Sequence, residues 1–312
     1  MRKKFIFHCG FPKCASTSLQ YSFNNSEVNF LGFNPSYKNK KFYKNHELSF
    51  FFEQVIRFGN NINFQKTKDK ISNYLVAAYE GTNKNTILSN ENIIGRFLPY
   101  DLPNEIKIER LCMILPTSSS ILIAIRDIPS LLFSYFNLYI SNGYCENIDY
   151  FFDEVKMLDE AFSFSGSLLL SSVVEQIKLL RPDIEVIIID IDNKHSYDQI
   201  LHYLEVNSIN ERKNRSIAYS DLERHLELNR KSFGGKNFLD WFEIHRVFPK
   251  ATVNDKLKFK LSRYRHKHEE IVESDFNSGK IKKEFIEKIP SVFKKISKKN
   301  YQFYKSCSYI RK

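Results

Sequence analysis

The chain has 312 residues, of which 47 are Lys or Arg and 36 are Asp or Glu, so its formal net charge is +11. Hydrophobic residues make up 42% and charged residues 27%, which is typical of globular proteins and excludes an intrinsically disordered chain. With only 10 Gly and 9 Pro, collagen-like and low-complexity architectures are excluded as well. We expect a single domain, residues 1–312, with a core over about 1–206 and a helical C-terminal extension over about 207–312.

The five cysteines are scattered and show no CxxC or Cys/His ligand spacing, so the sequence predicts neither a disulfide framework nor a zinc site. The basic N-terminus is followed by an apolar stretch that is too short for a signal peptide. The longest apolar stretch, residues 121–140, is interrupted by Arg126 and Asp127, which disfavours a membrane span. We therefore expect a soluble, cytoplasmic protein.

Short apolar runs alternate with amphipathic segments along the first two thirds of the chain. Runs without a helical period that end at Gly, Pro or polar residues are typical of buried strands. In chain order the sequence predicts a strand at 4–8, a helix at 16–24, a strand at 28–32, helices at 47–58 and 67–79, a strand at 86–89, a helix at 103–115, a strand at 120–125, a helix from about 129, a helix at 166–180, a strand at 185–189 and a helix at 196–206.

Strands that alternate with helices predict a parallel sheet with right-handed crossovers. We therefore expect an α/β fold of three layers, with a central parallel sheet flanked by helices. A charged, Lys-rich and helical C-terminal elaboration follows it. Open parallel sheets bind ligands at the carboxyl ends of their strands, so residues that follow a predicted strand are the first candidates for a site.

The segment HCGFPKCASTSLQ runs from the first predicted strand into the first predicted helix. The first turn of a helix presents unpaired N–H groups and the positive end of its dipole, which favours a bound anion. Gly10 lets the chain turn without a side chain in the way, Pro12 stiffens the loop and Lys13 supplies a cation. The hydroxyls of residues 16–18 add hydrogen-bond donors.

A Walker A loop, GxxxxGK[ST], requires a second Gly and a Lys directly followed by Ser or Thr. Here Lys13 precedes Ser16 by three residues, and the loop has no second Gly. The order and spacing instead resemble the 5′-phosphosulfate loop, GxPKxx[ST]T, of sulfotransferases that use 3′-phosphoadenosine 5′-phosphosulfate (PAPS). The chain matches that loop at Gly10, Pro12, Lys13, Ser16 and Thr17.

A second motif follows the predicted strand at 120–125. Arg126 comes directly after that strand, and Ser134 comes eight residues later in the predicted helix. In sulfotransferases such a pair holds the 3′-phosphate of the nucleotide. The forked, permanent charge of a guanidinium suits a dianionic phosphate, and a helix hydroxyl can contact the same group. The family usually shows Asn-Pro or Asp-Pro directly after the Arg, whereas here Ile128 separates Asp127 from Pro129.

The resemblance implies a PAPS-dependent sulfotransferase of the bacterial or carbohydrate-type branch, with a P-loop-like fold. Such an enzyme transfers a sulfuryl group from PAPS to a hydroxyl acceptor, here a saccharide or cell-surface glycan, and releases 3′-phosphoadenosine 5′-phosphate (PAP) without a metal. Lys13 would neutralise the leaving group. The nucleotide contacts that the resemblance implies are Gly10, Pro12, Lys13, Cys14, Ala15, Ser16, Thr17, Ser18, Arg126 and Ser134.

Transfer to a hydroxyl also requires a general base. Glu91, in TILSNENI, follows a short predicted strand and is the first candidate, which makes Lys13 and Glu91 the expected catalytic residues. His8 is the second candidate for the base. Glu91 would alternatively stabilise the first turn of a following helix.

Two other classes of protein remain open. A P-loop nucleotide kinase would share the fold, although the Walker A spacing is missing. A non-enzymatic polyanion-binding or nucleic-acid-binding protein agrees with the net charge and with the Lys-rich segment 256–312, but solvated helix faces carry such lysines too. We expect no specific nucleic-acid partner, and peripheral contact of the basic C-terminal helices with an anionic membrane or glycan stays an alternative.

Overall fold

The computed structural model describes residues 3–11, 14, 16–24, 26–32, 46–91, 93–96, 101–141, 148–206 and 278–307. These residues fall into two compact units. The sheet unit comprises the described residues of 3–127, 162–206 and 295–307, and the helical unit those of 128–161 and 278–294. None of the helices in the described ranges has the length and apolar character needed to cross a membrane.

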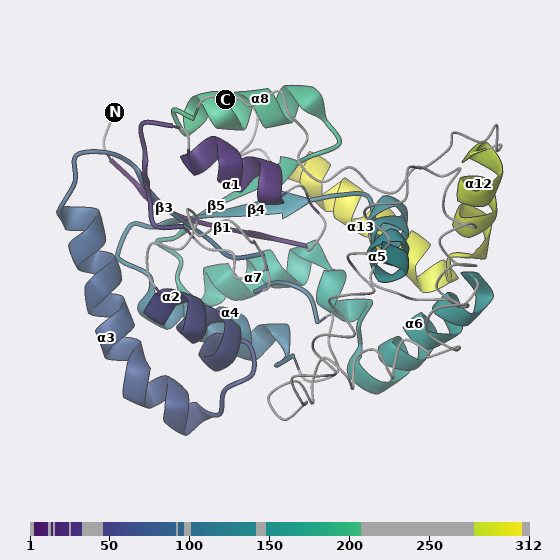
Figure 1. Ribbon diagram of the computed structural model, residues 1–312, viewed down its shortest axis with the longest axis horizontal. Coiled ribbons are helices and arrows are strands. Elements are labelled where there is room, and N and C mark those ends of the chain that lie inside the picture. Colours follow the sequence, from purple (N-terminus) through teal and green to yellow (C-terminus); the bar gives the residue numbers. More distant parts are fainter. Residues whose placement is uncertain are drawn as a thin grey trace. The chain divides into compact units, whose positions relative to one another are not determined.

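The described residues of the sheet unit form a parallel sheet of five strands (Figure 1). The strands are β1 (Phe5–Gly10), β2 (Asn29–Phe30), β3 (Thr86–Ser89), β4 (Ser120–Ile125) and β5 (Glu185–Asp190). Their order across the sheet is β2-β3-β1-β4-β5. In the central strand, Phe7 pairs with Leu88 of β3 on one side and with Ile121 of β4 on the other. The five predicted strands are confirmed, with β2 shorter than predicted.

Seven helices of the described residues contribute to this unit, together with two short helical turns. The helices are α1 (Ser16–Asn24), α2 (His46–Phe50), α3 (Asn61–Glu80), α4 (Asn104–Ile114), α7 (Leu170–Leu180), α8 (Lys194–Tyr203) and, from residue 295 onward, α13 (Ser291–Ser306). A π-helical turn, η2 (Phe51–Ile56), follows α2, and a 3₁₀ turn, η3 (Gly166–Leu168), precedes α7.

Helices cover both faces of the sheet. Side chains of a strand alternate between faces, and those of β1 show which helices lie on each. Phe7 stacks on Phe52 of η2 with ring centroids 5.6 Å apart, whereas the next residue, His8, contacts Phe23 of α1 at 5.6 Å. Figure 1 shows α1 and α8 on one side of the sheet and α2, α3, α4 and α7 on the other. The predicted α/β fold with a central parallel sheet flanked by helices is confirmed.

Helix boundaries differ from the prediction where caps and bends decide them. The helix predicted at 67–79 begins at Asn61, because the Asn60 side chain accepts a hydrogen bond from the Asn63 N–H at 2.9 Å and caps the helix there. The single helix predicted at 47–58 consists of α2 and the π-helical turn η2. The helix predicted at 166–180 is divided at Leu169, which is extended.

The helical unit is organised around aromatic side chains. It contains α5 (Ile128–Ser141), α6 (Ile148–Phe162), which the sequence did not predict, and α12 (Ser278–Lys288). Phe285 of α12 is fully buried. Its ring centroid lies 4.9, 5.5, 6.0 and 4.7 Å from those of Phe133, Phe136, Phe151 and Phe152. Within the predicted helical C-terminal extension, α12 and α13 (Ser291–Ser306) are helical, whereas 207–277 lie outside the described residues.

Candidate functional site

The chain leaves β1 and β4 in opposite directions, although the two strands are neighbours. β1 is followed by β2 on one side of the sheet, and β4 is followed by β5 on the other. Neighbouring parallel strands with this property open a crevice at their carboxyl ends, where open α/β sheets bind their ligands. The two sequence motifs begin at this point, because Gly10 ends β1 and Arg126 directly follows β4.

Gly10 lies against the backbone of β4. The N–H of Phe11 donates to the carbonyl oxygen of Ala124 at 3.1 Å, and a Cβ atom placed on Gly10 would lie 2.4 Å from that oxygen. Glycine therefore keeps β1 paired with β4 up to the start of the loop. The N–H of Cys14 donates to the carbonyl of Phe11 at 3.2 Å, which closes a turn, and α1 begins at Ser16. The strand, turn and helix that the motif requires are present.

Part of this first motif falls outside the described part of the chain. Three of its residues are not described: Pro12, Lys13 and Ala15. Ser16 and Thr17 begin α1, but the structure describes only their backbone. Ser18 is half-buried. The contacts expected of these residues with a nucleotide, and the catalytic role of Lys13, stay predictions.

The pKa of the Cys14 thiol depends on the charged groups that surround the loop. Burial raises its pKa well above the ordinary value, the charge of Arg126 lowers it, and the charges of Asp192, Glu91 and Asp190 raise it. Glu91 follows β3, Arg126 follows β4, and the two aspartates lie at the end of β5. The carboxyl ends of three strands thus bring charged groups to the loop that follows β1, and two of these groups are the predicted Glu91 and Arg126.

Glu91 lies at the carboxyl ends of the strands, as the sequence predicted. The N–H of Asn90 donates to the carbonyl of His8 at 2.8 Å and extends the pairing of β3 with β1 by one residue. Glu91 comes next, half-buried in a turn. The next helix of the described residues, α4, begins only at Asn104, so the alternative role of Glu91 in a first helical turn has no support.

His8, the second candidate for the base, is fully buried between β1 and α1. Its Nδ1 lies 2.7 Å from the hydroxyl oxygen of Ser89, which also accepts a hydrogen bond from the Gln20 amide at 3.0 Å. Its Nε2 has no hydrogen-bond partner among the described residues. Burial lowers the pKa of His8 to about 3, so the ring is neutral and closed off from the crevice.

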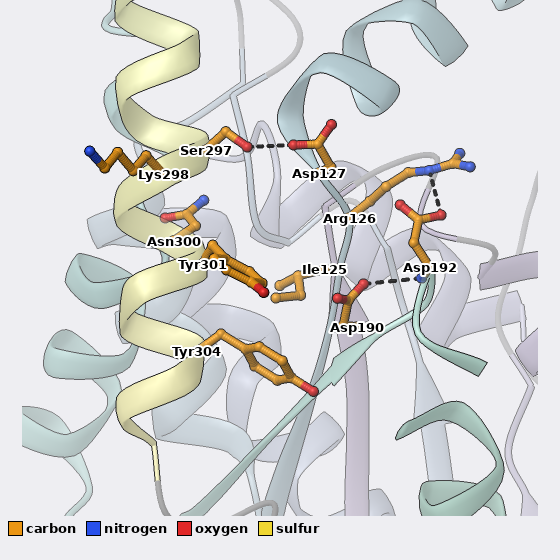
Figure 2. A pocket seen from close by; sticks show the side chains of 10 residues that line it. All are labelled: Ile125, Arg126, Asp127, Asp190, Asp192, Ser297, Lys298, Asn300, Tyr301 and Tyr304. Carbon is orange, nitrogen blue, oxygen red and sulfur yellow. Dashed lines mark hydrogen bonds and ion pairs between the residues drawn. The ribbon is translucent and has the colours of Figure 1, made fainter. Parts of the chain in front are cut away.

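A pocket of about 360 Å³ opens at the carboxyl ends of β4 and β5, within the sheet unit (Figure 2). It is lined by Ile125, Arg126, Asp127, Asp190, Asp192, Ser297, Lys298, Asn300, Tyr301 and Tyr304. Figure 2 shows the rings of Tyr301 and Tyr304 reaching from α13 toward Ile125 and Asp190. Its volume lies within the range of small-molecule sites, whereas its lining is more polar than is usual for them.

Carboxylates outnumber cations among the residues that line this pocket. Arg126 Nε lies 3.4 Å from Asp192 Oδ1, and the backbone N–H of Asp192 donates to Asp190 Oδ1 at 3.0 Å. Burial raises the pKa of Asp190; that N–H lowers it, and the charges of Asp192 and Asp127 raise it further. With Lys298 as the other cation in the lining, an anion that binds Arg126 has to compete with Asp192.

Helix α13 is fastened to the sheet unit by side-chain hydrogen bonds. The Ser297 hydroxyl donates to Asp127 at 2.6 Å, and the Asn300 amide donates to the Leu168 carbonyl at 2.8 Å and accepts from the Leu170 N–H at 2.9 Å. Asp127, Asp190, Tyr301 and other lining residues were not among the predicted site residues. An acidic residue after the strand at 185–189 was the available signal for Asp190, whereas no local pattern indicates that α13 forms a wall of the pocket.

Ser134 lies in the second turn of α5, in the helical unit, and is 8% exposed. The eight-residue step from Arg126 therefore leads into a helix, as predicted. The joint contact of Arg126 and Ser134 with one phosphate stays a prediction. Within the described ranges, no group of three or more His, Cys, Asp or Glu side chains is placed to hold a metal ion.

Neither a family model, nor a curated protein, nor a solved structure matches this chain. A fold class by itself does not determine function, so the residues of the site decide what chemistry the protein can perform.

Proposed function

We propose that the protein is a PAPS-dependent sulfotransferase with a P-loop-like fold, which transfers a sulfuryl group to a hydroxyl of a saccharide or cell-surface glycan. One observation carries the proposal. The two motifs that resemble the nucleotide-binding segments of sulfotransferases are far apart in the sequence, yet they follow β1 and β4, the neighbouring strands from which the chain departs in opposite directions.

The geometry around Gly10 supports a phosphate at the first loop. The tight approach of β1 to β4 is followed by a turn and by the start of α1, whose first N–H groups and dipole favour an anion. Lys13 would contribute a positive charge beside the 5′-phosphate and the bridging oxygen. The proposed site for the sulfuryl donor therefore begins at the amino end of α1.

Arg126 can bind the 3′-phosphate of the nucleotide if the phosphate replaces Asp192 as the partner of the guanidinium. The Arg126 and Asp192 side chains are 26% and 41% exposed, and ion pairs with such exposure contribute little to stability. A phosphate dianion offers more negative charge than a carboxylate and accepts paired hydrogen bonds from a guanidinium. The ion pair thus keeps Arg126 in place without preventing the exchange.

In the proposed reaction the acceptor oxygen attacks the sulfur atom while its proton passes to the Glu91 carboxylate. A new sulfur–oxygen bond forms, the bond from sulfur to the bridging oxygen of the 5′-phosphate breaks, and PAP leaves with the electron pair. Lys13 and the first N–H groups of α1 stabilise the charge on the departing oxygen. Glu91 and the loop lie at the same edge of the sheet, which this sequence of steps requires.

The experiment compares PAP binding with transfer of ³⁵S from labelled PAPS to fractionated glycans. Lys13→Ala and Arg126→Ala should each weaken PAP binding about a hundredfold and abolish transfer, because each removes a charged hydrogen-bond donor from a phosphate. Glu91→Gln should keep PAP binding and lose transfer. Lys84→Ala, which removes an exposed lysine next to β3, is the matched control and should change neither. Normal PAP binding by both the Lys13 and the Arg126 variant would overturn the proposal.

A further inference from the structure

The part of α13 that belongs to the sheet unit presents a basic face to solvent. This lysine face consists of four exposed side chains: Lys295, Lys298, Lys299 and Lys305. Helix α13 contains no Asp or Glu. Among the described residues, no carboxylate forms an ion pair with these four lysines. By contrast, two exposed lysines elsewhere in the unit are paired, Lys70 with Glu47 at 2.8 Å and Lys84 with Glu27 at 2.7 Å.

The apolar side of the same helix is used for packing. Ile296 and Asn300 are 8% and 6% exposed, and Asn300 is bonded to the backbone at η3 and α7. Tyr301 is the large hydrophobic side chain that α13 exposes, and Lys305 Nζ lies 4.4 Å from its ring centroid. A helix that binds a bilayer needs an apolar face free to enter it. Helix α13 is therefore not suited to insertion into a bilayer, and its lysines remain available to an anionic ligand at the protein surface.

The lysine face is continuous with the pocket at the carboxyl ends of β4 and β5. Lys298 belongs to both, and Tyr301 and Tyr304 line the pocket from the same helix. Inside, the carboxylates of Asp190 and Asp192 can accept hydrogen bonds from hydroxyl groups, and tyrosine rings can pack on the apolar face of a sugar. From Lys295 to Lys305 the helix advances by about 15 Å, which is longer than one sugar ring.

We propose that the lysine face of α13 is a docking surface for an acidic polysaccharide, one ring of which presents its hydroxyls to the pocket. The lysines bind anionic groups of the neighbouring rings, and the hydroxyls of the ring that enters donate to Asp190, which leaves Arg126 to the 3′-phosphate of the proposed donor. The assignment of this polysaccharide as the sulfation acceptor rests on the proposed function. The docking itself depends only on the charge and shape of the surface.

The test is calorimetric titration of the full chain with a polyuronate octasaccharide at low and high salt. Lys295→Gln/Lys299→Gln removes two lysines that do not line the pocket. It should weaken octasaccharide binding about tenfold at low salt, because each lysine contributes a long-range attraction to an anionic ligand. Lys66→Gln/Lys70→Gln has the same charge change and the same spacing on α3, and it should leave the affinity unchanged.

Several results would overturn the docking surface. They are equal binding of neutral maltooctaose, an equal loss in the α3 control, and tighter binding of anionic phospholipid vesicles or of short single-stranded DNA than of the octasaccharide. PAP titration of the same variants separates the two proposals. If the octasaccharide binds to the lysine face and PAP does not bind, the sulfotransferase assignment is wrong and the docking surface stands. If PAP binds and the octasaccharide does not, the docking surface is wrong.

Discussion

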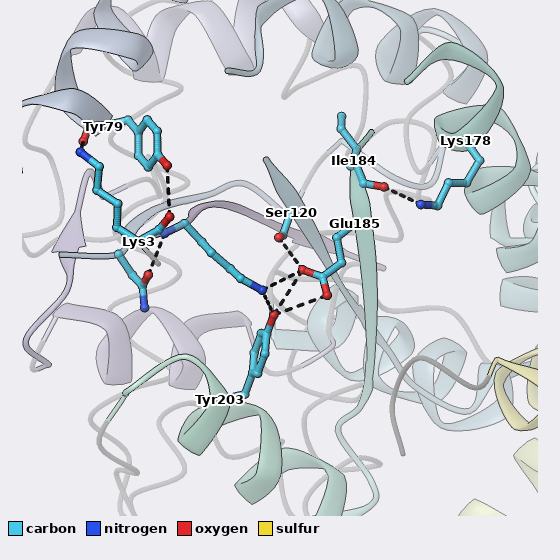
Figure 3. Close-up of polar contacts among 9 residues, drawn as sticks. Lys3, Tyr79, Ser120, Lys178, Ile184, Glu185 and Tyr203 are labelled. Atoms are coloured by element: carbon cyan, nitrogen blue, oxygen red, sulfur yellow. Dashed lines mark hydrogen bonds and ion pairs between the residues drawn. The ribbon is translucent and has the colours of Figure 1, made fainter. Parts of the chain in front are cut away.

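Charged side chains are paired differently at the two ends of the strands. We call the amino ends of the strands the amino edge of the sheet and their carboxyl ends the carboxyl edge. At the amino edge Glu185 has a complete set of partners: Lys4 Nζ lies 3.0 Å away, and the hydroxyls of Ser120 and Tyr203 donate to it at 2.9 and 3.2 Å (Figure 3). At the carboxyl edge, carboxylates outnumber cations among the described residues that line the pocket. Charges at the amino edge therefore stabilise the fold, whereas those at the carboxyl edge line a pocket that the proposed function assigns to a ligand.

Cationic side chains at the amino edge also donate hydrogen bonds to backbone carbonyls at the ends of helices. Lys3 Nζ donates to the carbonyls of Tyr79 and Thr82 at 3.0 and 2.9 Å, at the end of α3, where unpaired carbonyls favour a cation. Arg181 bonds to Asp183 at 2.7 Å and to the Cys112 carbonyl at 3.0 Å, near the end of α4. Each cation here has a structural partner, so variants at this edge should change stability and leave nucleotide binding intact.

The largest effect is expected at Gly10, where the carboxyl edge begins. Gly10→Ala places a Cβ 2.4 Å from the Ala124 carbonyl oxygen, a backbone atom that cannot rotate away. The variant should lose about 3 kcal/mol of unfolding free energy, measured by urea denaturation. In Gly166→Ala the nearest atom is the Ser163 hydroxyl at 2.4 Å, which can rotate, so this control should lose much less. Equal losses would show that the approach of β1 to β4 is not tight.

His8 should make the fold sensitive to acid. Burial lowers its pKa to about 3 from 6.5, so below pH 6.5 the unfolded chain binds a proton that the folded chain does not. The stability due to neutral His8 is complete above that pH and is lost as the pH falls toward 3, with about 2 kcal/mol lost at pH 5. Urea denaturation near neutrality and near pH 5 measures it. His8→Gln should lose less stability on acidification, and identical pH dependence of the two proteins would contradict the burial of a neutral ring.

A smaller effect is expected from Glu185 at the amino edge. Burial raises its pKa, but hydrogen bonds from Lys4 and Ser120 outweigh this and hold the pKa below 4.5. The stability it contributes is present above pH 4.5 and is lost as the pH falls through its folded-state pKa. Because the side chain is 46% exposed, Glu185→Gln should cost only about 0.5–1 kcal/mol in urea denaturation. The affinity for PAP should be unchanged. A changed affinity would contradict the conclusion that charges at the amino edge contribute only to stability.

The smallest effect on stability, and the opposite effect on binding, is expected at Asp192. Asp192→Asn removes the carboxylate that lies 3.4 Å from Arg126 and competes with a phosphate for it. PAP should bind about three- to tenfold more tightly in calorimetry, a gain that damage to the fold would not produce. Asp183→Asn, which breaks the Arg181 pair at the amino edge, should leave PAP affinity unchanged. Unchanged or weaker PAP binding by Asp192→Asn would contradict the competition.

Local sequence patterns predicted most of the sheet and the positions of the two motifs. The apolar runs of β3 and β4 have the predicted bounds, and α1 begins at Ser16 and ends at Asn24, because burial on both faces and a change of period are visible within a few residues. The same reasoning brought Glu91 and Arg126 to the carboxyl edge, since parallel strands end at one edge.

The rest of the site depends on contacts between distant segments. Ser297 bonds to Asp127 across 170 positions, and this bond helps to place Tyr301 beside the pocket. The helical period of the apolar residues in α13 indicates which face is buried, but it does not indicate that this helix packs at the carboxyl ends of β4 and β5. The pairing of Arg126 with Asp192 was missed for the same reason, because it joins the loops after two different strands.

The most direct test of the central claim is calorimetric titration of the wild-type chain and Arg126→Ala with PAP and, side by side, with ATP. The account predicts that PAP binds to the wild type more tightly than ATP and that the Arg126 variant loses this preference. Tighter binding of ATP, absence of PAP binding, or PAP binding that does not depend on Arg126 would contradict it.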